Sequence, residues 1–233
     1  MRIGPAPERG NGWPAQGRCA WPLSSWQNPI AADELYLAQT RLGARGSEVI
    51  TGKAFSDSAL LGRDDLNDYK IIHFATHGLV TAPRPQCPAQ PALLTSFGDS
   101  QSDGLLSFKE IFDLRLDADL VILSACDTAG MATIAASREA GISSGGNYAL
   151  DGLVRAFVGA GARSVLASHW PVPDDFDATK TLISGIFTVG QSLPVGKALA
   201  RTQYNMMDNP LTSHPYYWAA FILVGDGGKV VIP

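Results

Sequence analysis

The sequence predicts an α/β fold with a mostly parallel central sheet and helices on both of its faces. Two segments, 70–76 and 119–125, are almost wholly apolar, as strands are when both faces of a parallel sheet are covered. Segments with helical spacing of apolar residues separate these strands from the later strand candidates, and such alternation is typical of parallel sheets. The 233 residues, 45% of them hydrophobic and 17% charged, suit one folded domain.

The remaining elements follow from local patterns. Leu35, Leu37, Ala38 and Leu42 form one apolar helical face, Ser56 is a candidate helix cap, and Ser107 with Glu110 matches a capping box. Further strands are expected at 47–51, 162–167 and 219–224, and helices at 31–42, 56–61, 107–114, 149–160, 174–188 and 195–207.

The domain is expected to span 30–233. Five prolines among Gly, Asn and Ser make 1–29 an irregular lead-in or linker. The segments 81–103 and 128–148 are long, polar loops, and long loops in compact domains are often functional. The loop at 128–148 contains Arg138 and is a candidate for self-cleavage or activation.

Charge and composition exclude several classes of partner. The net charge is −4 and no run of Lys or Arg is present, so direct binding to nucleic acid is not expected. No apolar stretch reaches the roughly 20 residues that cross a bilayer, and no apolar segment at the N-terminus suggests a signal peptide. The three cysteines, Cys19, Cys87 and Cys126, lack metal-ligand spacing, which favours reduced thiols in the cytoplasm.

Two chemically active side chains follow the two apolar strands. His77 comes directly after the first and Cys126 directly after the second. Parallel strands present their carboxyl ends at one edge, about 4.8 Å apart when adjacent, so an imidazole and a thiol there can meet. Imidazole can take the thiol proton and later deliver it to a leaving amine. The sequence therefore predicts a nucleophile, Cys126, with His77 as its base.

The backbone around the two residues completes this chemistry. Gly78 has no Cβ, so its N–H can approach a bound peptide, and the N–H of Cys126 is the expected second donor to the oxyanion. Asp127 and Asp103 are candidate substrate carboxylates, suited to a basic P1 side chain. The mechanism requires no metal and no organic cofactor.

Five segments in order resemble the CHAT domain, a bacterial branch of the caspase, separase and gingipain superfamily. They are 72–78 (IHFATHG), 120–128 (LVILSACDT), 161–165 (GARSV), 168–172 (SHWPV) and 214–221 (HPYYWAAF). The resemblance implies a caspase-hemoglobinase fold, the dyad His77 and Cys126, and a cysteine endopeptidase acting on proteins in a bacterial signalling or defence pathway. It also implies a helical-repeat domain or a regulatory protein as partner. Asp127 stands where the family commonly has Glu, and His169 where it often has Leu.

Other interpretations remain open for the other candidate residues. His73 lies four residues before His77 and is interpreted as a hydrogen-bonded core histidine, and His214 as structural. Asp174, Asp175 and Asp177 with His169 resemble a metal cluster but also match the acidic first turn of a helix.

The motifs of rival enzyme classes are absent from the sequence. No serine occupies a Gly-x-Ser-x-Gly elbow, and neither a Gly-x-Gly-x-x-Gly motif after a strand nor a Walker loop is present. The alternative of a different class is a catalytically silent CHAT scaffold that binds proteins through its loops.

Overall fold

The computed structural model describes residues 21–27, 29–43, 45–79, 86–87, 91–124, 148–170 and 177–232. Its centre is a four-stranded sheet in the order β1-β5-β6-β7. The strands are β1 (Ile71–Ala75), β5 (Leu120–Ser124), β6 (Ser164–Ser168) and β7 (Phe221–Gly225). The first three are parallel and β7 is antiparallel to β6, which confirms the mostly parallel sheet.

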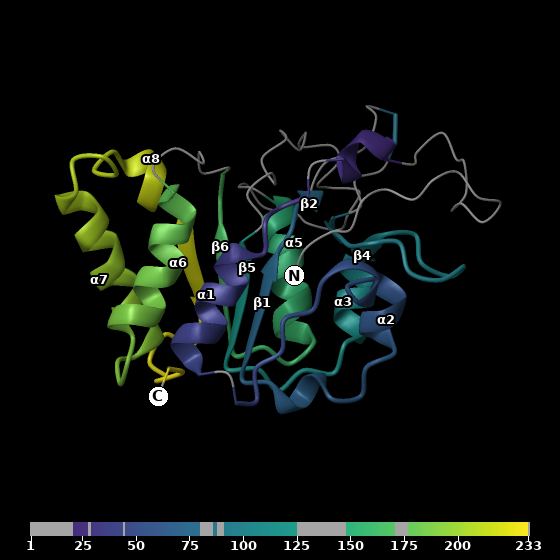
Figure 1. Cartoon of the computed structure of the whole chain (residues 1–233), viewed down its shortest axis with the longest axis horizontal. Helices are drawn as coiled ribbons and strands as arrows, with labels where there is room; N and C mark the ends of the chain where they lie inside the picture. Colours follow the sequence, from purple (N-terminus) through teal and green to yellow (C-terminus); the bar gives the residue numbers. More distant parts are fainter. Residues whose placement is uncertain are drawn as a thin grey trace.

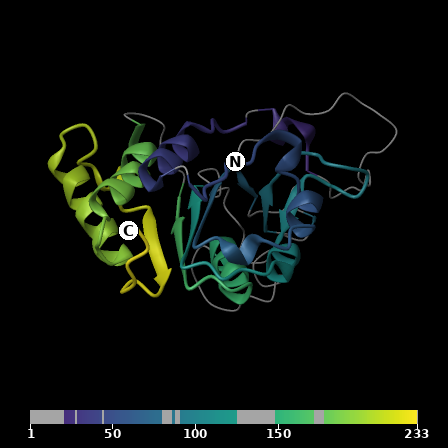
Figure 2. The ribbon, with the colours of Figure 1, turned by 60° about the horizontal axis from the view of Figure 1, so that its bottom comes forward.

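Helices cover both faces of this sheet, as expected (Figure 1). Three helices, α1 (Asp33–Leu42), α6 (Ala178–Val189) and α7 (Val195–Asp208), lie on one face, and α5 (Tyr148–Gly159) and α3 (Phe108–Asp113) lie on the other. Figure 2 shows the same layers turned by 60°. Alternate strand residues enter the two cores: Leu120 and Ile122 pack with α6, while Val121 and Leu123 pack with α5.

A second sheet continues from the end of β1. It has three antiparallel strands in the order β2 (Gly78–Leu79), β3 (Ala92–Leu94) and β4 (Leu105–Ser107). The prediction of an irregular loop over 81–103 is therefore wrong at β3. The apolar run of β3 is only three residues long, and its strand conformation depends on pairing with distant segments that bury it completely.

Two of the short helices begin directly after the residues that cap them. Helix α2 (Asp57–Leu61) begins after Ser56, whose hydroxyl accepts the N–H of Ala59, and the capping box of Ser107 and Glu110 opens α3. Both caps were predicted and are confirmed. Short 3-10 helices occupy Leu23–Trp26, Gly52–Ala54 and Leu66–Asp68, and α8 is Pro215–Trp218. Within the predicted lead-in, Trp26 is buried and donates its Nε1–H to the carbonyl of Thr95.

Two predicted elements differ from the structure. The segment 47–51 forms no strand, because none of its backbone groups bonds to a neighbouring strand among the described residues. Helix α6 begins at Ala178 rather than at 174, after Asp177 with φ of 50°, and 174–176 lie outside the described residues. In the described ranges, no helix combines the length and the apolar character needed to cross a membrane.

Candidate active site

The parallel pairing of β1 with β5 sets the geometry of the candidate site. Ala75 pairs with Ser124, the last described residue of β5, so the carboxyl ends of the two strands lie at the same edge. His77 follows β1 at this edge. The predicted nucleophile Cys126 and the predicted substrate residue Asp127 lie outside the described residues.

The second sheet fixes the backbone of His77. The carbonyl of His77 accepts the N–H of Leu94 at 2.8 Å, and the hydroxyl of Thr76 donates to the carbonyl of Leu94 at 2.6 Å. The next residue, Gly78, is buried and pairs with Leu93. The His77 side chain is half-buried. β3 thus holds the strand end from which this imidazole projects.

A buried contact between a histidine and a carboxylate lies beneath this edge. Nε2 of His73 is 2.6 Å from Oε1 of Glu34, and the two side chains are only 8% and 13% exposed. This confirms the interpretation of His73 as a buried, partnered core residue. Glu34 was not singled out from the sequence, because an acidic residue in the first turn of a helix usually serves the helix dipole in solvent.

The surroundings of Glu34 keep its carboxyl group ionised. Burial by itself would raise the pKa of Glu34, but the neighbouring imidazole of His73 and the hydroxyl group of Ser124 together hold it below the ordinary 4.5. Ser124 is also buried. Helix α1 is therefore joined to β1 and β5 by polar contacts directly below the strand ends.

We expect Glu34→Gln to destabilise the fold by about 2 kcal/mol at neutral pH, because it removes the negative charge that lies 2.6 Å from Nε2 of His73. A carboxyl group whose pKa is lowered by folding stabilises the protein above its unfolded pKa. The difference between wild type and variant should therefore narrow as the pH falls below 4.5. Urea unfolding across the acid range measures this, and a difference independent of pH would contradict it.

The structure places Asp103 in the loop between β3 and β4. Its N–H donates to Oδ2 of Asp57 at 3.1 Å, and its own Oδ1 accepts the N–H of Leu105 at 3.0 Å. Burial raises the pKa of Asp103, and the nearby charges of Asp57 and Glu110 add to this rise. Its role in binding substrate stays a prediction.

Residues after β6 lie near the same edge. The N–H of His169 donates to the carbonyl of Ala220, and Trp170 stacks on Tyr216 with ring centroids 6.1 Å apart. His214 caps α8 by accepting the N–H of Tyr216 on Nδ1, which confirms its structural role.

No metal cluster is found in the described ranges, where no three side chains among His, Cys, Asp and Glu are grouped as ligands. Asp177 precedes α6, where negative charge favours the helix dipole, although its side chain makes no capping hydrogen bond. The other two aspartates of the proposed cluster or cap, Asp174 and Asp175, lie outside the described residues.

One cysteine differs from expectation. Cys87 is 5% exposed and disulfide-bonded, so the prediction of reduced thiols is wrong for this residue. The other two cysteines of the chain, Cys19 and Cys126, both lie outside the described residues. Spacing along the sequence does not reveal such a bond, because pairing depends on which loops meet in the fold.

Comparisons with known proteins extend these observations. The family model described as the CHAT domain matches residues 7–226 and thus begins within the predicted lead-in. Tetratricopeptide repeat protein 28 from Homo sapiens is 28% identical over 240 residues, which cover 88% of this chain and 9% of the human protein. The Mus musculus protein of the same name gives the same identity and coverage. The chain thus spans about 9% of the length of the curated relatives it matches.

Proposed function

Because this chain belongs to the CHAT domain family, a caspase-like family, we propose that it is a cysteine-type endopeptidase whose dyad is His77 and Cys126. The observation that carries this proposal is the parallel register of β1 and β5. It aligns the strand end that precedes His77 with the strand end that precedes Cys126.

The register supports a close approach of the two side chains. Ala75 pairs with Ser124, and His77 and Cys126 each follow two residues later. Adjacent parallel strands lie about 4.8 Å apart, so two side chains that each follow a strand end by two residues can come within reach of one another.

The hydrogen bonds of the second sheet support Gly78 as an oxyanion donor. The N–H of Leu94 bonds to the carbonyl of His77, so these two residues form a hydrogen-bonded pair of the antiparallel ladder. Residues alternate along such a ladder, and the neighbouring pair of Gly78 and Leu93 directs its N–H groups away from the partner strand. The N–H of Gly78 is therefore directed away from β3, and the N–H of Cys126 is the proposed second donor.

The proposed reaction proceeds through an acyl-enzyme. His77 takes the proton of the Cys126 thiol, and the sulfur attacks the scissile carbonyl to form a tetrahedral oxyanion. The C–N bond then breaks, and His77 returns the proton to the leaving amine. Water, deprotonated by His77, attacks the thioester and releases the acid product and the free thiol. The substrate is a protein or peptide, and Asp127 and Asp103 are proposed to favour a basic P1 residue.

A partner and a location are also proposed. The relatives are named as tetratricopeptide repeat proteins, which supports a helical-repeat segment or regulatory protein as partner. The bacterial signalling or defence pathway stays a proposal, since these relatives come from human and mouse. Cytoplasmic location also stays a proposal, and the disulfide at Cys87 weighs against it.

Thiol mapping of the native protein tests the proposed dyad. A nucleophilic thiol must be free, so we expect a peptidyl electrophile to label Cys126. We then expect Cys87 to form its disulfide with Cys19. Mass spectrometry of peptides prepared without reduction detects both the labelled cysteine and the disulfide. As a control, reduction followed by iodoacetamide shows whether all three cysteine-containing peptides are detected. Recovery of a Cys87–Cys126 disulfide would contradict an active dyad in the oxidised chain. Absence of label under reducing conditions as well would favour the silent scaffold.

A further inference from the structure

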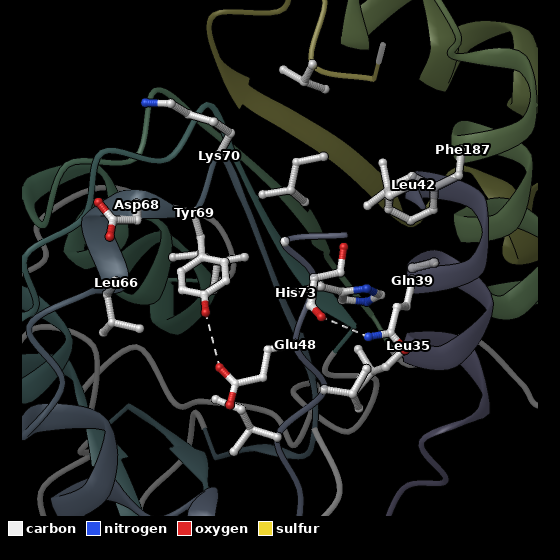
Figure 3. A pocket seen from close by; sticks show the side chains of 18 of the residues that line it. Leu35, Gln39, Leu42, Glu48, Leu66, Asp68, Tyr69, Lys70, His73 and Phe187 are labelled. Carbon is white, nitrogen blue, oxygen red and sulfur yellow. Dashed lines mark hydrogen bonds between the residues drawn. The ribbon is translucent and has the colours of Figure 1, made fainter. Parts of the chain in front are cut away.

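Helices α3 and α5 expose apolar side chains on the side of the sheet opposite to α1 (Figure 1). Phe108 and Phe112 on α3 are 38% and 52% exposed, and Val158 on α5 is 45% exposed. We call these three residues the α3–α5 face. Figure 3 shows a cavity of about 350 Å³ that α1 and β1 help to line, and none of the three residues borders it. Exposed apolar groups that lie together often mark a site of protein interaction.

The two phenylalanines of this face are held in place by local packing. They lie four residues apart on α3, about one helical turn, and their ring centroids are 6.3 Å apart. The ring of Phe112 also lies against Gly159 of α5, where an added Cβ would be 2.3 Å from Cε2 of the ring. The glycine therefore allows the ring to rest on α5 beside Val158. Side chains that are already ordered lose little conformational entropy when a partner binds.

Three basic side chains flank the α3–α5 face. Lys109 lies on α3, Arg155 lies on α5, and Arg115 follows the end of α3. All three are exposed, and none of them forms an ion pair within the part of the chain that the structure describes. On the acidic side, Asp113 of α3 is exposed, while Glu110 is engaged in the capping box. Positive charge is therefore in excess among the described side chains around this face.

We propose that the α3–α5 face binds an acidic amphipathic helix of a partner protein. Two rings one turn apart on α3 match the spacing of apolar side chains along one face of such a helix, which can pack between them. Acidic side chains beside those apolar positions then meet Lys109, Arg115 and Arg155, and complementary charge favours the encounter and fixes the orientation. Aromatic residues and arginine are also enriched at the centres of protein interfaces.

Other occupants fit the charge of this face less well. Residues 1–20 of the chain contain three arginines and one glutamate, so like charges would meet. A second copy joined face to face would bring the same basic side chains together, because a two-fold interface pairs each patch with itself. Anionic lipids would attract the basic side chains, but the net charge of −4 on the whole chain opposes its approach to such a membrane.

The first test compares an acidic and a basic amphipathic peptide. The acidic peptide is acetylated, amidated, fluorescently labelled Glu-Leu-Ala-Glu-Leu-Leu-Glu-Ala-Leu-Leu-Glu-Glu-Leu-Ala, and the basic peptide has Lys in place of each Glu. The protein is the full chain carrying Cys126→Ala, so cleavage by the proposed dyad does not affect the result. We expect fluorescence anisotropy to show at least tenfold tighter binding of the acidic peptide, weakened by added salt. Failure of the acidic peptide to bind, or equal binding of both peptides, would overturn the proposal.

Variants of the protein locate the binding site. Phe112→Ser should weaken binding of the acidic peptide at least tenfold, whereas Tyr204→Ser, which removes an exposed ring from α7 on the opposite side of the sheet, should not. The double variant Lys109→Glu with Arg155→Glu keeps both phenylalanines and should prefer the basic peptide, so the test stands even if Phe112→Ser fails to fold. Circular dichroism checks the fold of each variant. An unchanged preference in the folded double variant would contradict docking on this face.

Two further measurements distinguish the other occupants. Vesicles of phosphatidylcholine and phosphatidylserine that bind the parent chain but not Phe112→Ser would assign the face to a membrane surface. Analytical ultracentrifugation that shows self-association of the parent chain, lost in Phe112→Ser, would assign the face to a second copy. Either result would overturn a partner helix as the occupant.

Discussion

Replacing Cys126 by alanine is expected to lower peptide-bond cleavage by about 10³-fold or more, to the level of the background. The physical reason is that no other described group near His77 offers a thiol, and without the nucleophile no acyl-enzyme forms. Cleavage of a positional peptide library under reducing conditions measures the loss. Circular dichroism and thermal unfolding should match the wild type, because the change removes a single sulfur atom.

The matched controls for this variant are within the same chain. Cys19→Ala removes a cysteine outside the proposed dyad and should keep cleavage. His77→Asn should lose nearly as much as Cys126→Ala, and the double variant should lose no more than either, since the two side chains act as one unit. The same library reads P1 preference, and Asp127→Asn should weaken any preference for Arg or Lys. Full cleavage by Cys126→Ala would exclude the proposed mechanism.

Replacing Asp57 by alanine is expected to destabilise the protein by about 3 kcal/mol, since it leaves several buried donors without an acceptor. The carboxylate of Asp57 is 2% exposed and accepts hydrogen bonds from the hydroxyls of Thr95 and Ser102 and from the N–H of Asp103. It therefore joins α2 to the loop between β3 and β4. Thermal unfolding should show a midpoint lower by roughly 10 °C.

Asp65→Ala is the matched control for Asp57. Asp65 pairs with Arg63 at the surface, and exposed ion pairs contribute little to stability. Its replacement should leave the unfolding midpoint nearly unchanged. Equal effects of the two variants would mean that the hydrogen bonds of Asp57 do not hold the second sheet in place.

Local sequence patterns were sufficient to predict features that depend on residues close to one another along the chain. The hydroxyls of Ser56 and Ser107 cap helices as predicted, because a cap depends on backbone groups only a few residues away. β1 and β5 were predicted correctly because continuous apolar runs are stable only between two covered faces. β3 was missed, since its three residues become a strand only when β2 and β4 lie on either side.

In the candidate site, too, some residues could be predicted from the sequence and others could not. His77 was predicted from its position after a buried strand, and the structure adds the backbone contacts of Leu94 and Thr76 beside it. Glu34 had no signal in the sequence, because its partner His73 is distant along the chain and its burial arises only when α1 packs on the sheet. Asp57 was likewise not identified, because its partners come from a loop about 40 residues further along.

The sequence alone determined the α/β class, the strands of the central sheet and the two residues expected to carry out the chemistry. These follow from the alternation of apolar segments and from the residues that end them. Only the tertiary structure decided that Ala75 pairs with Ser124, that His73 is joined to Glu34, and that 46–50 lies beside β1 without pairing to it. Each of these depends on the distance between segments remote in sequence, which packing sets and local pattern does not encode.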